Sequence, residues 1–169
     1  MPHARLTGAP IRITKRQNLR VSRGRIVVGR GTHVHAATFI RRRHIVLDSD
    51  LLLDDVELRR ILIHELFHFV WVRLANNVRQ SFEKLLIGQR SVAGELGWSA
   101  EYRKDELALP DVRRRTRKWR EYCCEAFCDT AAYLYARSKQ HDEYTLPLRQ
   151  RKKRIRWFGK NLGAGSVRI

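Results

Sequence analysis

The stretch from Asp55 to Ala75 is the feature that most limits the folds open to this chain. It contains neither glycine nor proline, and its apolar side chains leave little polar face, so the pattern predicts a helix whose middle lies in the core. Asp54, followed three residues later by Glu57, has the form of a capping box and predicts the start of this helix. The pair Asn76 and Asn77 predicts its end.

Two histidines and a glutamate stand inside this apolar helix, in the order His64-Glu65-Leu66-Phe67-His68. Positions i and i+4 share a helix face with their β-carbons about 5–6 Å apart, so the two imidazoles can bind one metal ion. An unpaired glutamate in such a helix is costly unless a positive charge faces it. The spacing therefore predicts a Zn²⁺ site with His64 and His68 as ligands and Glu65 as the base that takes a proton from water.

A catalytic zinc site needs a third protein ligand and an open position for water. The downstream candidates are Glu95, Glu101, Glu121, Glu125 and His141. Glu125 is favoured because Asp129 lies four residues later on the same helical face, where its carboxylate can accept the other ring N–H of a ligating histidine.

The two motifs together resemble the gluzincin clan of zinc metallopeptidases, in which HExxH on one helix is completed by Glu-x-x-x-Asp on another. In this chain the second motif is Glu125-Ala126-Phe127-Cys128-Asp129, and the gap between the motifs suits a compact, minigluzincin-like member. The resemblance covers 43–137 at most. It implies zinc-dependent peptide-bond hydrolysis of a peptide or protein substrate, with a sheet packed against the active-site helix and an edge strand that pairs with extended peptide.

The same resemblance assigns roles residue by residue. It implies that His64, His68 and Glu125 are the metal ligands, that Glu65 is the general base, and that Asp129 is the acid that orients a ligand. A second pattern of small zincins, Glu-x-x-Ala-x-x-Phe-Ala, would instead make Glu121 the third ligand. Two alanines of that pattern are cysteines here, so Glu125 remains the preferred ligand and Glu121 the alternative.

The remaining patterns predict an α+β fold. Short strands are expected at 11–13, 25–28, 34–40 and 44–47, forming a small N-terminal β-sheet packed on the zincin active-site helix. A mainly helical C-terminal part should follow, with helices at 78–89 and 112–137. We expect one zincin-like catalytic domain over 1–148, with a basic N-terminal segment, and a basic C-terminal tail over 149–169.

The formal net charge of +18 is concentrated at the two ends. Residues 1–47 carry 11 Arg or Lys and residues 149–169 carry 8, and neither segment contains an acid. Basic ends of this kind can bind nucleic-acid phosphates by releasing condensed counterions, although solubilising tails look the same. The alternative function is therefore a nucleic-acid-associated protein whose zinc site targets bound proteins or is only structural.

Cysteines and hydropathy indicate the compartment. Cys123, Cys124 and Cys128 lack the spacing of a disulfide framework, which predicts reduced thiols. The first 20 residues contain no apolar run of the length that a secretory signal needs, and the most apolar later stretch is interrupted by the two histidines and Glu65. We expect a cytoplasmic protein without a membrane-spanning segment.

Overall fold

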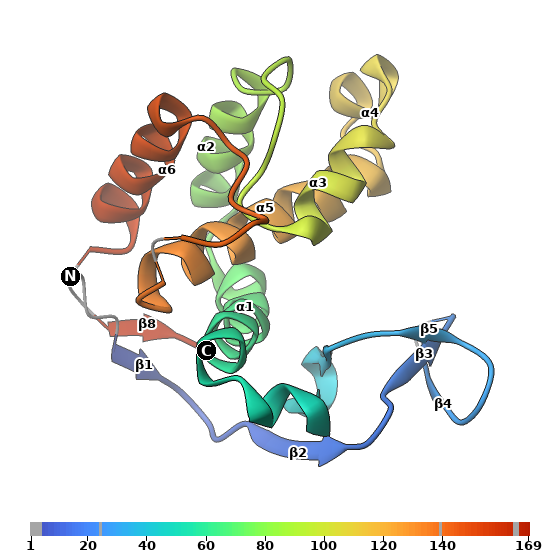
Figure 1. The fold of residues 1–169 in the computed structure, drawn as a ribbon. Helices are drawn as coiled ribbons and strands as arrows, with labels where there is room; N and C mark the ends of the chain where they lie inside the picture. The colour runs from blue at the N-terminus through green and yellow to red at the C-terminus, as the bar shows by residue number, and fades with distance from the viewer. Residues whose placement is uncertain (1–4, 24, 139, 164–165) are drawn as a thin grey trace.

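The computed structural model of the chain describes residues 5–23, 25–138, 140–163 and 166–169. It has the predicted α+β class, with small sheets formed mainly by the N-terminal part and helices in the C-terminal part (Figure 1). The long helices α1 (Asp55–Arg73) and α5 (Arg117–Tyr135) cross at the centre, and the strands lie beside α1 on one side of the molecule.

The central sheet has three strands in the order β2-β7-β6. β2 (Arg12–Arg16) runs parallel to β7 (His44–Asp48), and β6 (Ala36–Phe39) is antiparallel to β7. β7 is the most buried of the three because its side chains pack between the two edge strands and α1. The strands expected at 11–13, 34–40 and 44–47 are thus confirmed, with bounds shifted by a few residues.

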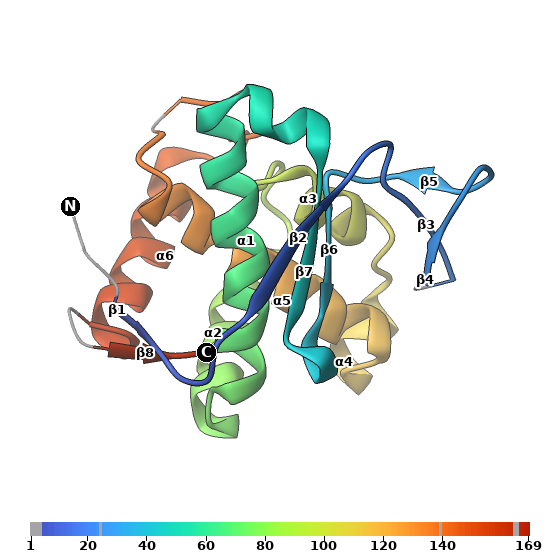
Figure 2. The ribbon, with the colours of Figure 1, turned by 90° about the horizontal axis from the view of Figure 1, so that it is seen from below.

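Two further sheets are small. The hairpin-like sheet β4-β3-β5 extends away from the body of the molecule (Figure 2), and its β4 confirms the strand expected at 25–28. The other sheet pairs the first and last strands of the chain, β1 and β8, in parallel. The bounds of these strands are β1 (Arg5–Thr7), β3 (Arg20–Ser22), β4 (Arg25–Val27), β5 (Thr32–His33) and β8 (Ser166–Arg168).

The helix α1 (Asp55–Arg73) begins as predicted, and Asp54 caps it by accepting from the backbone N–H groups of its first turn. It ends two residues before the predicted end at Ala75, and Asn76 and Asn77 begin the next helix instead of terminating this one. The second half of the expected capping box is wrong, because the Glu57 carboxylate accepts from Arg60 instead. α1 is apolar on opposite faces because it packs between two layers. Phe69 contacts the sheet, whereas Phe67 contacts the other helices.

The other helices cover the far side of α1. The helix expected at 78–89 is confirmed as α2, which begins two residues earlier than expected and is separated from α1 by Leu74 and Ala75. Among the described residues, no helix is both long and apolar enough to cross a membrane. The bounds are α2 (Asn76–Ile87), α3 (Trp98–Asp105), α4 (Leu109–Arg114), α5 (Arg117–Tyr135) and α6 (Leu148–Asn161).

The single helix expected at 112–137 is wrong, because the helix is interrupted at Arg115 and Thr116, between α4 and α5. Arg115 adopts a left-handed conformation with φ 47°. The carboxylate of Asp111 accepts from the backbone of Ala108 and from the hydroxyl of Thr116, at 3.0 and 2.7 Å. These local bonds compete with continued helix, as short polar side chains commonly do.

The segment 149–169, expected as a basic tail, is part of the folded body. α6 places Phe158 in the main core, and Arg154 on the same helix is fully buried. The Arg154 guanidinium lies 2.6 Å from the carboxylate of Glu95. The prediction of a tail is wrong because α6 is an amphipathic helix. Its many basic residues outnumber the few side chains that it buries, so its composition resembles that of a tail.

Candidate metal centre

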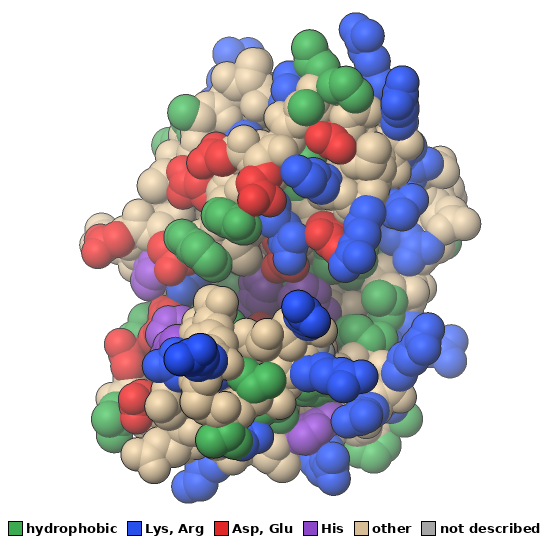
Figure 3. Space-filling view, turned by 90° about the vertical axis from the view of Figure 1, so that its right-hand side faces the viewer, with side chains coloured by type: hydrophobic (Ala, Val, Ile, Leu, Met, Phe, Trp, Pro, Cys, Tyr) green, Lys and Arg blue, Asp and Glu red, His purple; other side chains and the backbone are tan. Residues whose placement is uncertain are grey.

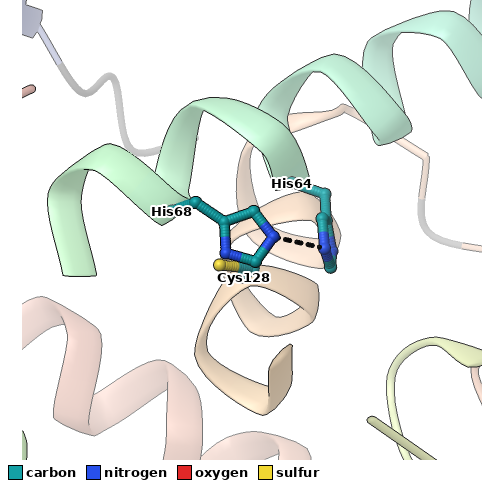
Figure 4. A group of neighbouring side chains, drawn as sticks. All are labelled: His64, His68 and Cys128. Atoms are coloured by element: carbon teal, nitrogen blue, oxygen red, sulfur yellow. Dashed lines mark hydrogen bonds between the residues drawn. The ribbon is translucent and has the colours of Figure 1, made fainter. Parts of the chain in front are cut away.

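The crossing of α1 and α5 brings the predicted ligands together. The Nε2 atoms of His64 and His68 are 3.2 Å apart, on one face of α1 (Figure 4). Oε2 of Glu125, from α5, lies 3.2 Å from Nε2 of His64 and 3.9 Å from Nε2 of His68. Three donor atoms of the types that zinc prefers thus surround one point.

The spacing of these atoms fits a tetrahedral ion. With bonds of about 2.0–2.1 Å, the ligand atoms of tetrahedral zinc stand about 3.3 Å from one another. The two shorter separations match this value, and the distance from Glu125 to His68 exceeds it by an amount that a small side-chain rotation removes. The residues present therefore fit a metal ion bound by two imidazoles and one carboxylate.

Asp129 orients His64 through the ring nitrogen that does not face the other ligands. Its Oδ1 accepts the Nδ1–H of His64 at 2.7 Å, which leaves Nε2 to face the other ligands. The carboxylate is itself fixed at the start of α3, where its Oδ2 accepts from the backbone N–H of Ala100 at 3.2 Å. Gly97 gives it room, because a β-carbon there would stand 2.4–2.5 Å from three carboxylate atoms.

A cysteine takes the corresponding place behind the second histidine. Nδ1 of His68 lies 3.3 Å from Sγ of Cys124, one residue before Glu125 on α5. Cys128 is close as well: its sulfur and the two histidines offer ligand atoms that all lie within 4.8 Å of one another (Figure 4). The set of His64, His68 and Cys128 could therefore also hold a metal.

The alternative ligand Glu121 points to arginines. Its carboxylate accepts from Arg103 at 2.9 Å and from Arg117 at 2.6 Å. Nε of Arg103 also lies 3.5 Å from the second carboxylate oxygen, Oε1, of Glu125. Glu121 therefore helps to hold an arginine against the preferred ligand, and its described contacts do not include either histidine.

The other candidate ligands are occupied elsewhere. Glu95 is buried and pairs with Arg154 and Lys104, and Tyr122 donates a hydrogen bond to it. Glu101 accepts from Thr145, and His141 lies 3.2 Å from Glu57. The described contacts bring none of the three to the pair of histidines.

The electrostatics favour positive charge between the ligands. Burial lowers the pKa of His64, but the carboxylates of Asp129 and Glu125 outweigh it and raise the pKa well above 6.5. For His68, burial is likewise outweighed by Cys124 and Glu125, and its pKa rises to about 9. Burial raises the pKa of Glu125, yet the two imidazoles lower it to about 2. The site stabilises cationic charge, supplied by protons or by a divalent metal.

The donor atoms open onto a cleft of about 640 Å³ between the sheet and α3. Figure 3 looks into this cleft and shows histidine side chains at its floor. Glu65 lines it, and its Oε2 accepts a hydrogen bond from the hydroxyl of Thr38 at 2.5 Å. Edge strand β6 forms one wall, and Trp98, 64% exposed, forms part of the other.

Three residues of the site were not anticipated from the sequence. Thr38 lies in a predicted strand, but only the fold places it opposite Glu65. Cys124 was interpreted as an ordinary reduced thiol. Gly97 acquires its role only in the fold, where the Asp129 carboxylate occupies the space that a β-carbon would fill.

Comparison with known proteins adds no assignment. No protein-family model matches the chain, and neither a curated protein nor a solved structure matches it.

Proposed function

We propose that this chain is a zinc-dependent peptidase of the gluzincin type, in which His64, His68 and Glu125 bind the metal. The observation that carries the proposal is the approach of two Nε2 atoms and one carboxylate oxygen to within 3.2–3.9 Å of one another. Glu65, next to the first ligand, faces the same cleft, so a base and a metal would act on one substrate.

The chemistry follows from the residues around the cleft. A bound zinc ion would polarise the scissile carbonyl and lower the pKa of a water molecule beside it. Glu65 accepts the proton of that water and passes it to the leaving amine. The hydrogen bond from Thr38 holds the Glu65 carboxylate at the cleft wall, so that the base does not have to be ordered during the reaction.

The proposed substrate is an extended peptide or an unstructured protein segment. β6 is an edge strand, and Ala36, Ala37 and Thr38 of this strand line the cleft. The free backbone groups of an edge strand can pair with a peptide laid along them. Pairing of this kind would bring the scissile bond past Glu65 and the ligand atoms.

Metal content is the first test. Wild-type protein should carry about one zinc per chain by elemental analysis, and His64→Ala or His68→Ala should lose it. His141→Ala is the matched control and should keep its zinc, because His141 contacts Glu57 and not the ligands. Full zinc content in a folded variant lacking both His64 and His68 would end the proposal.

The second test separates binding from chemistry at Glu65. Glu65→Gln should keep the fold and the zinc but lower hydrolysis by about two to four orders of magnitude, because an amide cannot accept the proton of water. A broad peptide library incubated with zinc-loaded wild type identifies the substrate, with Glu65→Gln as the blank. The exposed Glu106→Gln serves as a control that should remain active. Equal cleavage by wild type and Glu65→Gln would contradict the mechanism.

A further inference from the structure

A second hollow lies on the other side of strand β6. It has a volume of about 820 Å³ and is lined by residues of β2, β4, β6, β7 and the turn between β6 and β7. Thr38 points to Glu65 in the cleft, and neighbouring residues of a strand face opposite sides, so Phe39 faces this hollow. One strand thus separates the hollow from the candidate metal centre.

The hollow is unusually basic. Arg12, Arg25, Arg41 and Arg42 line it together with His44, and no acidic residue is among its lining residues. All four arginines are exposed. Within the described residues none of them forms a salt bridge, in contrast to the buried Arg60 and Arg154, each of which pairs with a carboxylate.

The residues around the hollow do not neutralise the charge of its arginines. The sequence holds no acid before Asp48, so the strands that build the hollow contribute no compensating charge except at the end of β7. Burial and the guanidinium groups of Arg12 and Arg42 lower the pKa of His44, as expected where cations converge. Figure 3 shows Lys and Arg side chains spread over the lower half of this face, below the cleft.

The floor of the hollow is apolar and partly aromatic. Ile26, Ile40 and Val46 line it, and the ring of Phe39 lies beside that of His44 with centroids 6.2 Å apart. Phe39 is only partly buried and is one of the residues that line the hollow. Guanidinium groups around an aromatic floor match the two contacts that single-stranded nucleic acid makes with proteins, backbone phosphate and stacked base.

We propose that this hollow binds single-stranded nucleic acid, with phosphates on Arg12, Arg25, Arg41 and Arg42 and a base against Phe39. The proposal stands independently of the peptidase activity, because none of these residues belongs to the metal centre. It places the nucleic-acid contact on a defined surface within the basic N-terminal segment 1–47. A strand bound there lies next to the cleft, so a protein carried on nucleic acid would be presented to it.

The test compares two variants with the same change in net charge. Arg41→Glu combined with Arg42→Glu reverses two charges at the hollow, and Arg149→Glu combined with Lys152→Glu reverses two exposed charges on α6. Binding of a fluorescent single-stranded DNA of about 12 nucleotides is measured by anisotropy at several salt concentrations. The hollow variant should bind about tenfold more weakly or worse, with a salt slope smaller by about 1.4, because two phosphate contacts are lost.

The control variant should bind within about threefold of wild type, since long-range charge alone contributes little at moderate salt. Equal weakening of both variants would overturn the site and leave only non-specific attraction to a basic protein. Phe39→Leu should weaken binding of the oligonucleotide but not of inorganic polyphosphate. Poly-glutamate that binds as tightly as the oligonucleotide would overturn the assignment to nucleic acid in favour of an acidic polypeptide. Circular dichroism establishes that each variant is folded.

Discussion

His68 directs its Nδ1 atom to the sulfur of Cys124 at 3.3 Å, whereas His64 directs its Nδ1 to the carboxylate of Asp129 at 2.7 Å. Both acceptors come from α5, which also supplies Glu125. The interaction between Cys124 and Cys128 lowers the pKa of Cys124 to about 6, with burial opposing and His68 adding to the effect. A thiolate there can accept the imidazole N–H as a carboxylate would.

The contact predicts that Cys124 affects metal affinity without being a ligand. Cys124→Ala removes the acceptor that fixes the His68 ring, and zinc affinity should fall by about 10–100-fold in a competition titration with a chelator. Cys124→Ser, which keeps an acceptor, should recover part of the loss. Cys123→Ala is the control and should bind zinc like wild type, because the Cys123 side chain lies in the core. Unchanged affinity in Cys124→Ala would show that the contact is packing only.

The choice between the two glutamates of α5 is equally open to measurement. Glu125→Ala should lose zinc, because its Oε2 is the third atom beside the two Nε2 atoms. Glu121→Ala should keep zinc and at most loosen Arg103, with which it pairs. Elemental analysis of the two purified variants distinguishes them. The opposite pattern would make Glu121 the ligand, and zinc retained in both would favour Cys128 as the third donor.

The sequence predicted α1 and its three polar residues because their spacing is a local property of one helix. It also predicted that Glu125 and Asp129 would share a helix face. The two motifs are joined by the crossing of α1 and α5. This crossing depends on packing between residues more than 55 positions apart, such as His68 and Cys124, and has no local sequence signature. Thr38 and Cys124 therefore could not be assigned, since each acquires a role only from the residue that the fold brings opposite to it.

The segment 149–169 was misinterpreted for a related reason. Composition describes it as a basic tail, but one arginine of α6 is buried against Glu95, more than 50 residues earlier in the chain. A buried ion pair has no local sequence signature, because neither partner is unusual by itself. Removal of this segment would take Phe158 and Arg154 from the core, so its role in nucleic-acid binding has to be tested by surface substitutions rather than by truncation.

The close approach of Gly97 to the Asp129 carboxylate predicts that a side chain at position 97 weakens metal binding. Gly97→Ala should push the Asp129 carboxylate away, because the added β-carbon would stand 2.4 Å from its Cγ. Zinc affinity should fall by about tenfold or more as His64 loses its acceptor. Gly159→Ala is the matched control: nothing lies within 4 Å of a β-carbon there, and alanine in a helix should be neutral or stabilise by up to about 1 kcal/mol. Equal zinc affinity in wild type and Gly97→Ala would contradict a tight fit at Asp129.

Because Glu95 and Arg154 form a buried ion pair, we expect the free energy of unfolding to depend on Arg154. Arg154→Met removes the closest cation of Glu95 and leaves Lys104 at 3.1 Å as its remaining partner. At pH 7 the free energy of unfolding, measured with urea, should fall by about 3 kcal/mol, because a buried carboxylate is then incompletely compensated. The double variant Glu95→Gln with Arg154→Met should recover part of this loss, since the uncompensated charge is gone.

The pH dependence of the same variant tests the cause. In the wild type, burial raises the pKa of Glu95, but Arg154 and Lys104 outweigh this effect and hold the pKa below 4.5. The ion pair therefore stabilises the fold fully above pH 4.5, and this contribution is lost as the pH falls through the lowered pKa. In Arg154→Met, burial has less opposition and the pKa of Glu95 should rise. The variant then gains a proton on folding, and its deficit relative to wild type should shrink between pH 7 and pH 4. Urea unfolding at the two pH values measures both deficits, and a deficit of the same size at both would mean that Arg154 acts through packing and not through its charge.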